Sequence, residues 1–284
     1  MKKPSLSKAL MRNIWKRVPS NDLFFNIGKV ITRTILKPQN EDITEEIIFA
    51  KEIKIKTNLS SFVCNDYYCL DHHYESSTLK LWKNLAQSSE IILDLGSHVG
   101  LFSLVAAHSS KPDAKIFAVE ADMNNFNMLR ENSSCYKNIS CINKAISSTG
   151  DLLWFCQKEN NDGGGFITSN QDIVQKPEYF CQKIPTIKLE DLCREYLISK
   201  IDLVKLDLEG LELELMTEEC EFWDLHSPSH IIVELTIQKN KRIDYNKLFD
   251  TMKRRGYKYK KIQSLYAVPL FKEYDLSNWH FEKA

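Results

Sequence analysis

Residues 94–100 read Asp94-Leu95-Gly96-Ser97-His98-Val99-Gly100 and lie between two apolar segments. The segment before them, Ile91-Ile92-Leu93, predicts a buried strand, and the segment after them, residues 101–107, predicts a helix. A strand that turns through glycine into a helix brings free backbone N–H groups together, which suits an anionic or strongly polar cofactor group. Glycine is scarce, with 9 in 284 residues, so Gly96 and Gly100 indicate positions where the backbone geometry requires it.

A second apolar strand, ending in an acid, follows about twenty residues after this loop. It reads Ile116-Phe117-Ala118-Val119-Glu120. In nucleoside-binding α/β units an acid at this position accepts hydrogen bonds from the two ribose hydroxyls. Asp94 and Glu120 together therefore predict a nucleoside cofactor site. The alternative is that Gly96 and Gly100 only allow a helix to pack close to the sheet.

From residue 78 onward the chain alternates between strand and helix patterns. Strands are expected at 91–95, 115–120, 139–143, 201–207 and 230–236, and helices at 78–87, 99–109, 123–133, 189–198, 210–217 and 245–255. This alternation predicts an α/β fold of the Rossmann-like, doubly wound type, with a mostly parallel seven-stranded sheet between helices. Strand patterns at 257–262 and 265–269 are separated by two residues, so they predict a C-terminal hairpin with one antiparallel strand.

Residues 1–45 are expected to form a basic N-terminal extension, ahead of a main domain at 46–284 that begins with a strand near 47–56. Four aliphatic residues recur every four positions, as in an amphipathic helix: Leu6, Leu10, Ile14 and Val18. A basic amphipathic helix suits an anionic membrane surface or a protein partner. Packing of this helix on its own domain would explain the pattern equally well.

The stretch 151–188 interrupts the alternation. It begins with a strand pattern at 152–156 and continues into a polar, glycine-rich run at 160–165. A long polar insertion in a compact domain is either functional or an ordinary flexible loop. As a functional segment it would form a lid or an acceptor wall near the cofactor.

Composition excludes several classes of protein. The 38 basic and 38 acidic residues cancel, so nothing in the net charge indicates nucleic-acid binding. No stretch approaches the roughly 18 uncharged apolar residues of a transmembrane helix. The N-terminal lysines are not followed by an apolar signal core, so a cytoplasmic location is expected rather than secretion.

The eight cysteines contain no C-x-x-C pair, which argues against a structural zinc site. We expect buried, reduced thiols, as is usual in cytosolic proteins. His226 and His230 have the spacing of metal ligands on a helix, but Pro228 between them disfavours a helix. No metal site is predicted there.

The other unusual stretch runs from Ile201 to Glu212 and reads IDLVKLDLEGLE. Along a strand, Lys205, Asp207 and Glu209 fall on one face. Charged side chains at the end of a central strand are costly unless they pair or meet a ligand. Since ligands of open α/β sheets bind beyond the carboxyl ends of the strands, the strand-end acids predict a negative crevice suited to a cation or a polyhydroxy ligand. A self-neutralising network of lysine and acids is the structural alternative.

At this point the sequence resembles the FkbM family of S-adenosylmethionine-dependent methyltransferases, which have the class I methyltransferase fold. Residues 94–100 are similar to the family's D-x-G-A-N-x-G cofactor loop, with His98 in place of Asn. Ala121 replaces the proline that follows the family's ribose acid. The run from Lys205 to Glu212 resembles K-x-D-x-E-G-x-E, the most specific match. The resemblance covers roughly residues 70–260, including counterparts of Tyr74-Glu75, the run from Asn143 to Ser147 and the run from Leu189 to Leu192.

This resemblance implies O-methylation of a hydroxyl on a sugar, a glycan, or a glycosylated or polyketide-like metabolite, with S-adenosylmethionine as cofactor. Cofactor contacts are expected from Asp94, Gly96, Ser97, His98, Gly100, Glu120, Ala121, Asn143 and Ala145. Asp207 or Glu209 would act as the base, with Lys205 holding Asp207 ionised or offsetting charge on the incipient alkoxide. Glu212 and Glu234 are expected to contact the acceptor. The acids would alternatively hold Mg²⁺ through oxygen ligands.

The acceptor itself is only weakly indicated. Four aromatic residues, Tyr67, Tyr68, Trp154 and Phe166, could stack on sugar rings, and core packing explains them equally well. Two other functions stay open. A nicotinamide-dependent oxidoreductase would need a glycine in the middle of the 94–100 loop, and none is there. A non-catalytic nucleoside-binding module on the same fold would not need the acids at 207 and 209.

Overall fold

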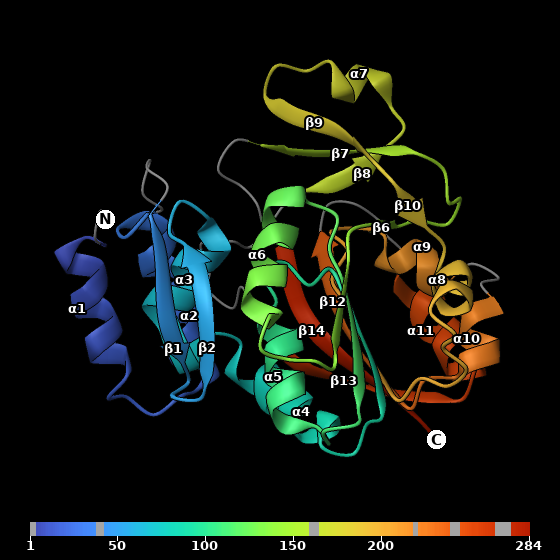
Figure 1. Ribbon diagram of the computed structural model, residues 1–284, viewed down its shortest axis with the longest axis horizontal. Helices are drawn as coiled ribbons and strands as arrows, with labels where there is room; N and C mark the ends of the chain where they lie inside the picture. The colour runs from blue at the N-terminus through green and yellow to red at the C-terminus, as the bar shows by residue number, and fades with distance from the viewer. Residues whose placement is uncertain (1–3, 38–42, 159–164, 218–220, 239–244, 265–273) are drawn as a thin grey trace.

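The computed structural model describes residues 4–37, 43–158, 165–217, 221–238, 245–264 and 274–284. A seven-stranded sheet runs through the middle of the molecule (Figure 1). Its strand order is β13-β14-β12-β11-β3-β4-β5. The strands are β3 (Ile91–Leu95), β4 (Lys115–Val119), β5 (Ile139–Ile142), β11 (Leu203–Leu206), β12 (His230–Gln238), β13 (Tyr257–Ser264) and β14 (Tyr274–Lys283).

The sheet is parallel except for β14, which pairs antiparallel with both β12 and β13. The predicted Rossmann-like fold, with a mostly parallel seven-stranded sheet and an antiparallel C-terminal strand, is confirmed. The antiparallel strand is β14, which lies later in the chain than we predicted. The strand predicted at 265–269 lies outside the described residues, and β13 ends just before it, at Ser264.

Helices cover both faces of the sheet (Figure 1). One face carries α4 (Ser76–Ala86), α5 (Leu101–Ser109) and α6 (Met123–Ser133), and the other carries α8 (Leu189–Glu195), α9 (Glu212–Thr217), α10 (Glu221–His226) and α11 (Tyr245–Arg254). Successive strand residues point to opposite faces, so Ile92 and Ile116 join the core under α4 and α5. Leu93 and Phe117 join the core under the second set of helices.

Residues before α4 build a separate helical lobe. It contains α1 (Leu6–Trp15), α2 (Asp22–Thr34), the hairpin of β1 (Thr44–Phe49) and β2 (Ile53–Asn58), α3 (Phe62–Leu70) and the short 3₁₀ helix η1 (Asp71–His73). Helices α1 and α2 both pack against α3. The lobe joins the main domain through contacts of β2 with α5 and α6 and of α2 with α4, and the two share the core under α4 and α5. The strand predicted near 47–56 is this hairpin, because a turn at Ala50–Lys51 with positive φ divides the segment.

The insertion is an ordered subdomain above the sheet (Figure 1). It contains β7 (Leu153–Lys158), β8 (Phe166–Thr168), α7 (Gln171–Val174), β9 (Tyr179–Ile184) and β10 (Thr186–Ile187), and β6 (Ala145–Ile146) comes just before it in the chain. The strands form a three-stranded sheet, β8-β7-β9, and a two-stranded one, β10-β6. Residues 160–164 of the predicted glycine-rich loop lie outside the described residues.

The insertion also corrects our prediction for the cysteines. Cys156 of β7 and Cys181 of β9 are joined by a disulfide. Antiparallel pairing places these two residues directly opposite each other, which spacing along the chain did not reveal. Of the other thiols in the described parts of the chain, Cys64, Cys69 and Cys193 are buried and Cys135 is exposed.

Candidate active site

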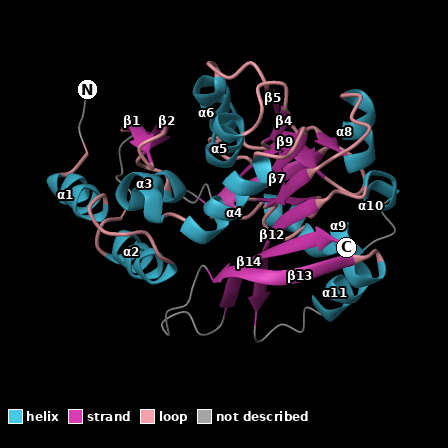
Figure 2. Cartoon of the chain, turned by 90° about the horizontal axis from the view of Figure 1, so that it is seen from below, coloured by secondary structure: helices cyan, strands magenta, loops and turns pink. Residues whose placement is uncertain are grey.

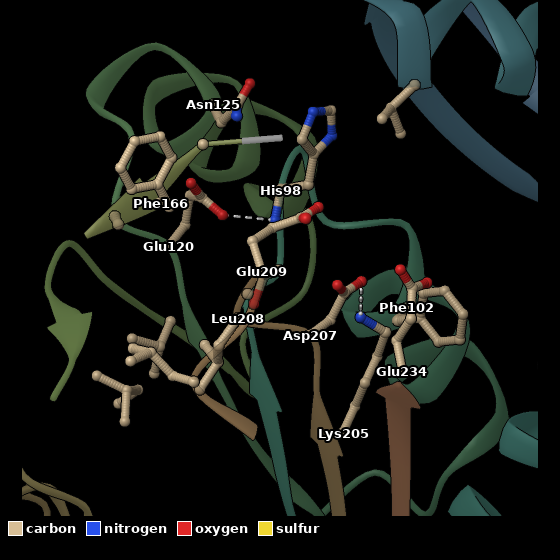
Figure 3. Close-up of a pocket in the computed structure, with 18 of the residues that line it drawn as sticks. His98, Phe102, Glu120, Asn125, Phe166, Lys205, Asp207, Leu208, Glu209 and Glu234 are labelled. Carbon is tan, nitrogen blue, oxygen red and sulfur yellow. Dashed lines mark hydrogen bonds and ion pairs between the residues drawn. The ribbon is translucent and has the colours of Figure 1, made fainter. Parts of the chain in front are cut away.

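A cavity of about 540 Å³ opens at the carboxyl ends of β3, β4, β11 and β12. Its size is typical of small-molecule sites. The strand ends form its floor, the insertion contributes Phe155 and Phe166, and the N-terminal lobe contributes Lys29 and Tyr67. Figure 3 shows Glu120, Asp207, Glu209 and Glu234 around this one cavity.

The 94–100 loop and Glu120 are joined by hydrogen bonds. Gly96 N and Ser97 N both donate to the carbonyl of Val119, at 2.9 Å each. His98 has a positive φ of 51°, and its backbone N–H donates to Glu120 Oε2 at 2.7 Å (Figure 3). The other carboxylate oxygen of Glu120 accepts from Asp122 N at 2.8 Å. The loop after β3 is therefore held in place by the acid at the end of β4.

Glu120 is almost fully buried, at 7% exposure, yet it lines the cavity. Burial raises its pKa from the ordinary 4.5 to about 7, against the lowering effect of the nearby His98 side chain and the two backbone N–H groups. A ligand that donates hydrogen bonds to this carboxylate would favour its ionised form. A ribose diol is such a ligand.

Asp94 supports the loop from below. Its side chain is fully buried, and Oδ2 accepts a hydrogen bond from Ser103 Oγ at 2.5 Å. The other oxygen, Oδ1, is buried without a hydrogen-bond partner among the described residues. Burial raises the pKa of Asp94, partly offset by the charge of Lys205.

Among the other predicted cofactor residues, Gly96, Ser97, His98, Ala121 and Ala145 line the cavity. Asp94, Gly100 and Asn143 are not part of the lining. Gly100 starts α5 with a positive φ of 99°. Asn143 Nδ2 donates to the carbonyls of Glu120 and Ala121, at 2.9 and 3.1 Å, and so holds the backbone after β4.

Lys205 and Asp207 form an ion pair on the cavity floor, with Lys205 Nζ 2.7 Å from Asp207 Oδ2 (Figure 3). The ammonium also lies 4.8 Å from the centre of the Phe102 ring. Burial alone would lower the pKa of Lys205, but the carboxylates of Asp207 and Asp94 outweigh it and raise the pKa. Lys205 is therefore a permanent cation beside Asp207.

Three more carboxylates surround Asp207. Burial, followed by the charge of Asp207, raises the pKa of Glu234 well above 4.5. The pKa of Glu209 is raised by the same causes, although Glu209 is exposed to solvent where it lines the cavity. Glu75 also has a raised pKa, caused by burial and partly offset by Lys205. Protonated carboxyl groups both donate and accept hydrogen bonds. This end of the cavity is therefore suited to a ligand with several hydroxyl groups.

Glu212 has a different place from the one we expected. Its carboxylate accepts from Leu208 N at 2.5 Å and Gly210 N at 3.0 Å, and it does not line the cavity. Burial raises its pKa to about 7. Glu212 thus shapes the turn that carries Glu209, whose φ is 55°.

Glu75 was not among our predicted site residues. It lines the cavity with a positive φ of 39°, and Asn278 Nδ2 of β14 donates to its Oε2 at 2.9 Å. Lys29, Arg33 and Asn125 also line the cavity and were missed. Of these four residues only Glu75 had a signal in the sequence, which was the family resemblance at Tyr74-Glu75.

Of the aromatic residues considered for the acceptor, Tyr67 and Phe166 line the cavity, whereas Tyr68 and Trp154 do not. Nowhere in the described ranges do three His, Cys, Asp or Glu side chains come together as metal ligands. The strand-end acids therefore give no support to the Mg²⁺ alternative.

The arrangement agrees with a comparison of the sequence with protein families. The family described as Methyltransferase FkbM domain matches residues 94–259, more than half of the chain. The match begins at the cofactor loop and includes the Lys205–Glu212 run. The chain belongs to the FkbM methyltransferase family. It is therefore a methyltransferase that depends on S-adenosylmethionine, and the oxidoreductase alternative is wrong.

Relatives of this FkbM methyltransferase are distant. A curated protein, methyltransferase sdnD of Sordaria araneosa, is 26% identical over 183 residues, which cover 55% of this chain and 68% of that protein. Among solved structures, the O-methyltransferase TomG of Streptomyces achromogenes is 12% identical, with a TM-score of 0.45, 94% of this chain covered and all of that one. TYW2 of M. jannaschii, solved with AdoMet, is also 12% identical, with a TM-score of 0.44 and coverages of 87% and 89%.

The residues of this FkbM methyltransferase fit the cofactor of its family. Glu120 faces the cavity with a carboxylate that a diol would help to ionise. Asp94 lies outside the lining, and its Oδ1 is a buried oxygen without a hydrogen-bond partner among the described residues. Gly96 leaves the loop without a side chain at the cavity wall.

None of the helices in the described segments is long and apolar enough to cross a membrane.

Proposed function

We propose that this protein transfers a methyl group to a hydroxyl of a sugar, a glycan, or a glycosylated or polyketide-like metabolite. The observation that carries the proposal is the Asp207 carboxylate, which faces the cavity while Lys205 holds it from below. A hydroxyl is a poor nucleophile until a base takes its proton as attack develops. Asp207 is the base with a fixed cation beside it.

When bound, S-adenosylmethionine supplies an electrophilic methyl group. Glu120 would accept hydrogen bonds from its ribose hydroxyls, and Gly96, Ser97 and His98 would border its amino-acid part. Much of the rate enhancement can come from positioning, because transfer needs the acceptor oxygen held close and in line. Holding the acceptor is the task we assign to the surrounding carboxyl groups.

Glu209, Glu234 and Glu75 support a hydroxyl-rich acceptor. Burial raises the pKa of all three carboxyl groups, which favours their protonated forms. Such groups can hydrogen-bond to neighbouring hydroxyls as donors and as acceptors. Tyr67 and Phe166 line the same cavity and would contact a sugar ring there. Lys205 would offset negative charge on the oxygen as its proton leaves.

The test uses labelled methyl transfer from S-adenosylmethionine into glycan and metabolite fractions of the host, with and without EDTA. We expect label in a hydroxyl-bearing fraction, as a base-stable methyl ether. Asp207→Asn should reduce transfer at least about a hundredfold, the scale of a lost general base, while binding of S-adenosylhomocysteine is retained. Asp191→Asn, an exposed substitution on α8, is the matched control and should transfer normally.

Two results would overturn the proposal in different ways. Label found on nitrogen or carbon would show that the protein transfers methyl groups but that its acceptor is not a hydroxyl. Tight binding of S-adenosylhomocysteine without transfer into any fraction would favour the non-catalytic module.

A further inference from the structure

The part of the N-terminal lobe that carries α1 and α2 differs in charge from the rest of the chain. Residues 1–40 contain nine lysines and arginines against a single acid, Asp22. The whole chain has 38 of each sign, so the remaining residues have 29 basic and 37 acidic side chains. Strong charge asymmetry within one chain indicates a charged binding surface.

Helix α1 packs with its basic side inward. Arg12 Nη1 donates to the carbonyl of Tyr68 at 2.6 Å, Nη2 donates to that of Ile48 at 3.0 Å, and the guanidinium pairs with Asp71 at 2.6 Å. Lys8 is also buried, and the Trp15 ring lies against His73. These contacts fix the rotation of α1 about its axis.

Because the basic side faces inward, the aliphatic row of α1 faces outward. Leu6 is 86% exposed, Leu10 58% and Ile14 52%. Helices of water-soluble proteins usually bury such a row, and we had considered that possibility from the sequence. Helix α1 does pack on its own domain, against α3, but through its other face, so the aliphatic row stays exposed.

Helix α2 repeats the arrangement. Its inner face buries Phe25 and Lys29, whereas Leu23 and Ile27 are 64% and 43% exposed. Across the described segments thirteen large hydrophobic residues are exposed, and six of them lie between Leu6 and Ile35. Both helices lie at the end of the molecule that carries the N-terminus (Figures 1 and 2). Concentrated aliphatic exposure of this kind marks an interaction surface.

We infer that the outward faces of α1 and α2 bind the surface of an anionic lipid bilayer. Leucine and isoleucine side chains would enter the boundary between headgroups and acyl chains. Lys16, Arg17 and Lys37 are exposed at the ends of the two helices and would meet anionic headgroups. Nucleic acid would match the charge but gives the exposed aliphatic rows no partner. The same face of a second copy would cover the aliphatic rows but offers no opposite charge to Lys16, Arg17 and Lys37.

This surface lies close to the active site. Lys29 and Arg33 on the inner side of α2 line the cavity, while Leu23 and Ile27 occupy its outer side. A helix with its side chains is about 10–12 Å across. The cavity would therefore lie about one helix diameter from the bilayer, where it can receive an acceptor that is itself anchored in lipid.

The experiment is co-sedimentation of the full-length protein with vesicles of phosphatidylcholine alone and with vesicles that also contain phosphatidylglycerol. We expect binding to the anionic vesicles only, weakened by added NaCl. The double variant Leu10→Glu/Ile14→Glu should bind at least about tenfold more weakly, because charged side chains cannot enter the boundary region. Leu225→Glu on α10, where Leu225 is 69% exposed, is the matched control and should bind like the wild type.

S-adenosylhomocysteine binding, measured in parallel, shows that the variants are folded and is independent of the lipid result. The inference is wrong if the wild type ignores anionic vesicles, or if the double variant binds them as well as the wild type. A dimer in sedimentation that Leu10→Glu/Ile14→Glu converts to a monomer, without vesicle binding by either, would make the surface a contact between copies instead.

Discussion

The backbone of Gly96 lies so close to Asp207 that a Cβ atom on residue 96 would come 1.8 Å from the Asp207 carbonyl oxygen. Asp207 N in turn donates to the carbonyl of Leu95 at 3.0 Å. The cofactor loop and the proposed base are thus parts of one rigid junction between β3 and β11. A change in the position of one must move the other.

Gly96→Ala should therefore damage both stability and cofactor binding. The new methyl group collides with backbone, and the φ of 82° is unfavourable for alanine. We expect a loss of at least about 2 kcal/mol in the free energy of unfolding, measured in urea. Gly150→Ala is the control, since its φ is 74° and its Cβ would meet only the Lys188 side chain, no closer than 3.5 Å. Equal losses in the two variants would mean that the collision with Asp207 is relieved at little cost.

Two buried acids, Glu120 and Glu212, should each lower the stability of the cofactor-free protein as the pH rises. Glu120 and Glu212 each have a pKa raised from 4.5 to about 7, mainly by burial. Between these values the folded state keeps a proton that the unfolded chain has released, so raising the pH favours unfolding. Each group contributes a slope of at most about 1.4 kcal/mol per pH unit. Urea unfolding between pH 4.5 and 7 should be less pH-dependent in Glu120→Gln, and an unchanged slope would contradict the assignment.

The Lys205–Asp207 pair should be coupled energetically. Lys205 is 6% exposed, so Lys205→Met leaves Asp207 among other acids without its cation. We expect a loss of about 2–3 kcal/mol, below the 3–5 kcal/mol of fully buried pairs because the Asp207 side chain is 29% exposed. Adding Asp207→Asn should restore part of that stability. A double-mutant cycle in urea measures the coupling, and strictly additive losses would show that the two groups act independently.

The disulfide should stabilise the insertion. Cys156 and Cys181 are 25 residues apart, and closing a loop of that size contributes about 3 kcal/mol in the chain-entropy treatment. Cys156→Ser/Cys181→Ser should unfold at lower denaturant, and added reductant should bring the wild type to the same midpoint. Cys135→Ser removes an exposed free thiol and should leave the midpoint unchanged. A wild type insensitive to reductant would argue against a formed disulfide.

The fold and the cofactor side of the cavity could be predicted because their signals are local. Apolar runs such as Ile91–Leu93 and Ile116–Val119 end in acids, and parallel strands bring their carboxyl ends to one edge. That geometry alone places Glu120 near Asp207. We expected Glu212 to contact the acceptor because it follows a strand, as the other acids of the site do. In the structure its carboxylate accepts hydrogen bonds from backbone N–H groups of its own turn.

The acceptor side could not be predicted because it is assembled from distant segments. Lys29 comes from a helix in the N-terminal lobe, and its sequence neighbours give no sign of a cavity. β14 was missed because Ser277, Asn278 and His280 are buried polar residues that interrupt the apolar alternation of a strand. The disulfide could not be predicted, because the spacing of cysteines along the chain does not show which strands pair.

The hydrogen bond between Glu75 and Asn278 also bears on how the protein is made. β14 lies between β12 and β13 in the sheet and follows both of them in the chain, so the described part of β13 has no neighbouring strand to pair with until β14 has been synthesised. In the nascent chain β3 and β4, which carry the cofactor side of the cavity, would form early. The hydrogen bond from Asn278 to Glu75 would form only after β14 has been made. The strand ends that carry Asp94 and Glu120 would thus be synthesised well before the strand that supports Glu75.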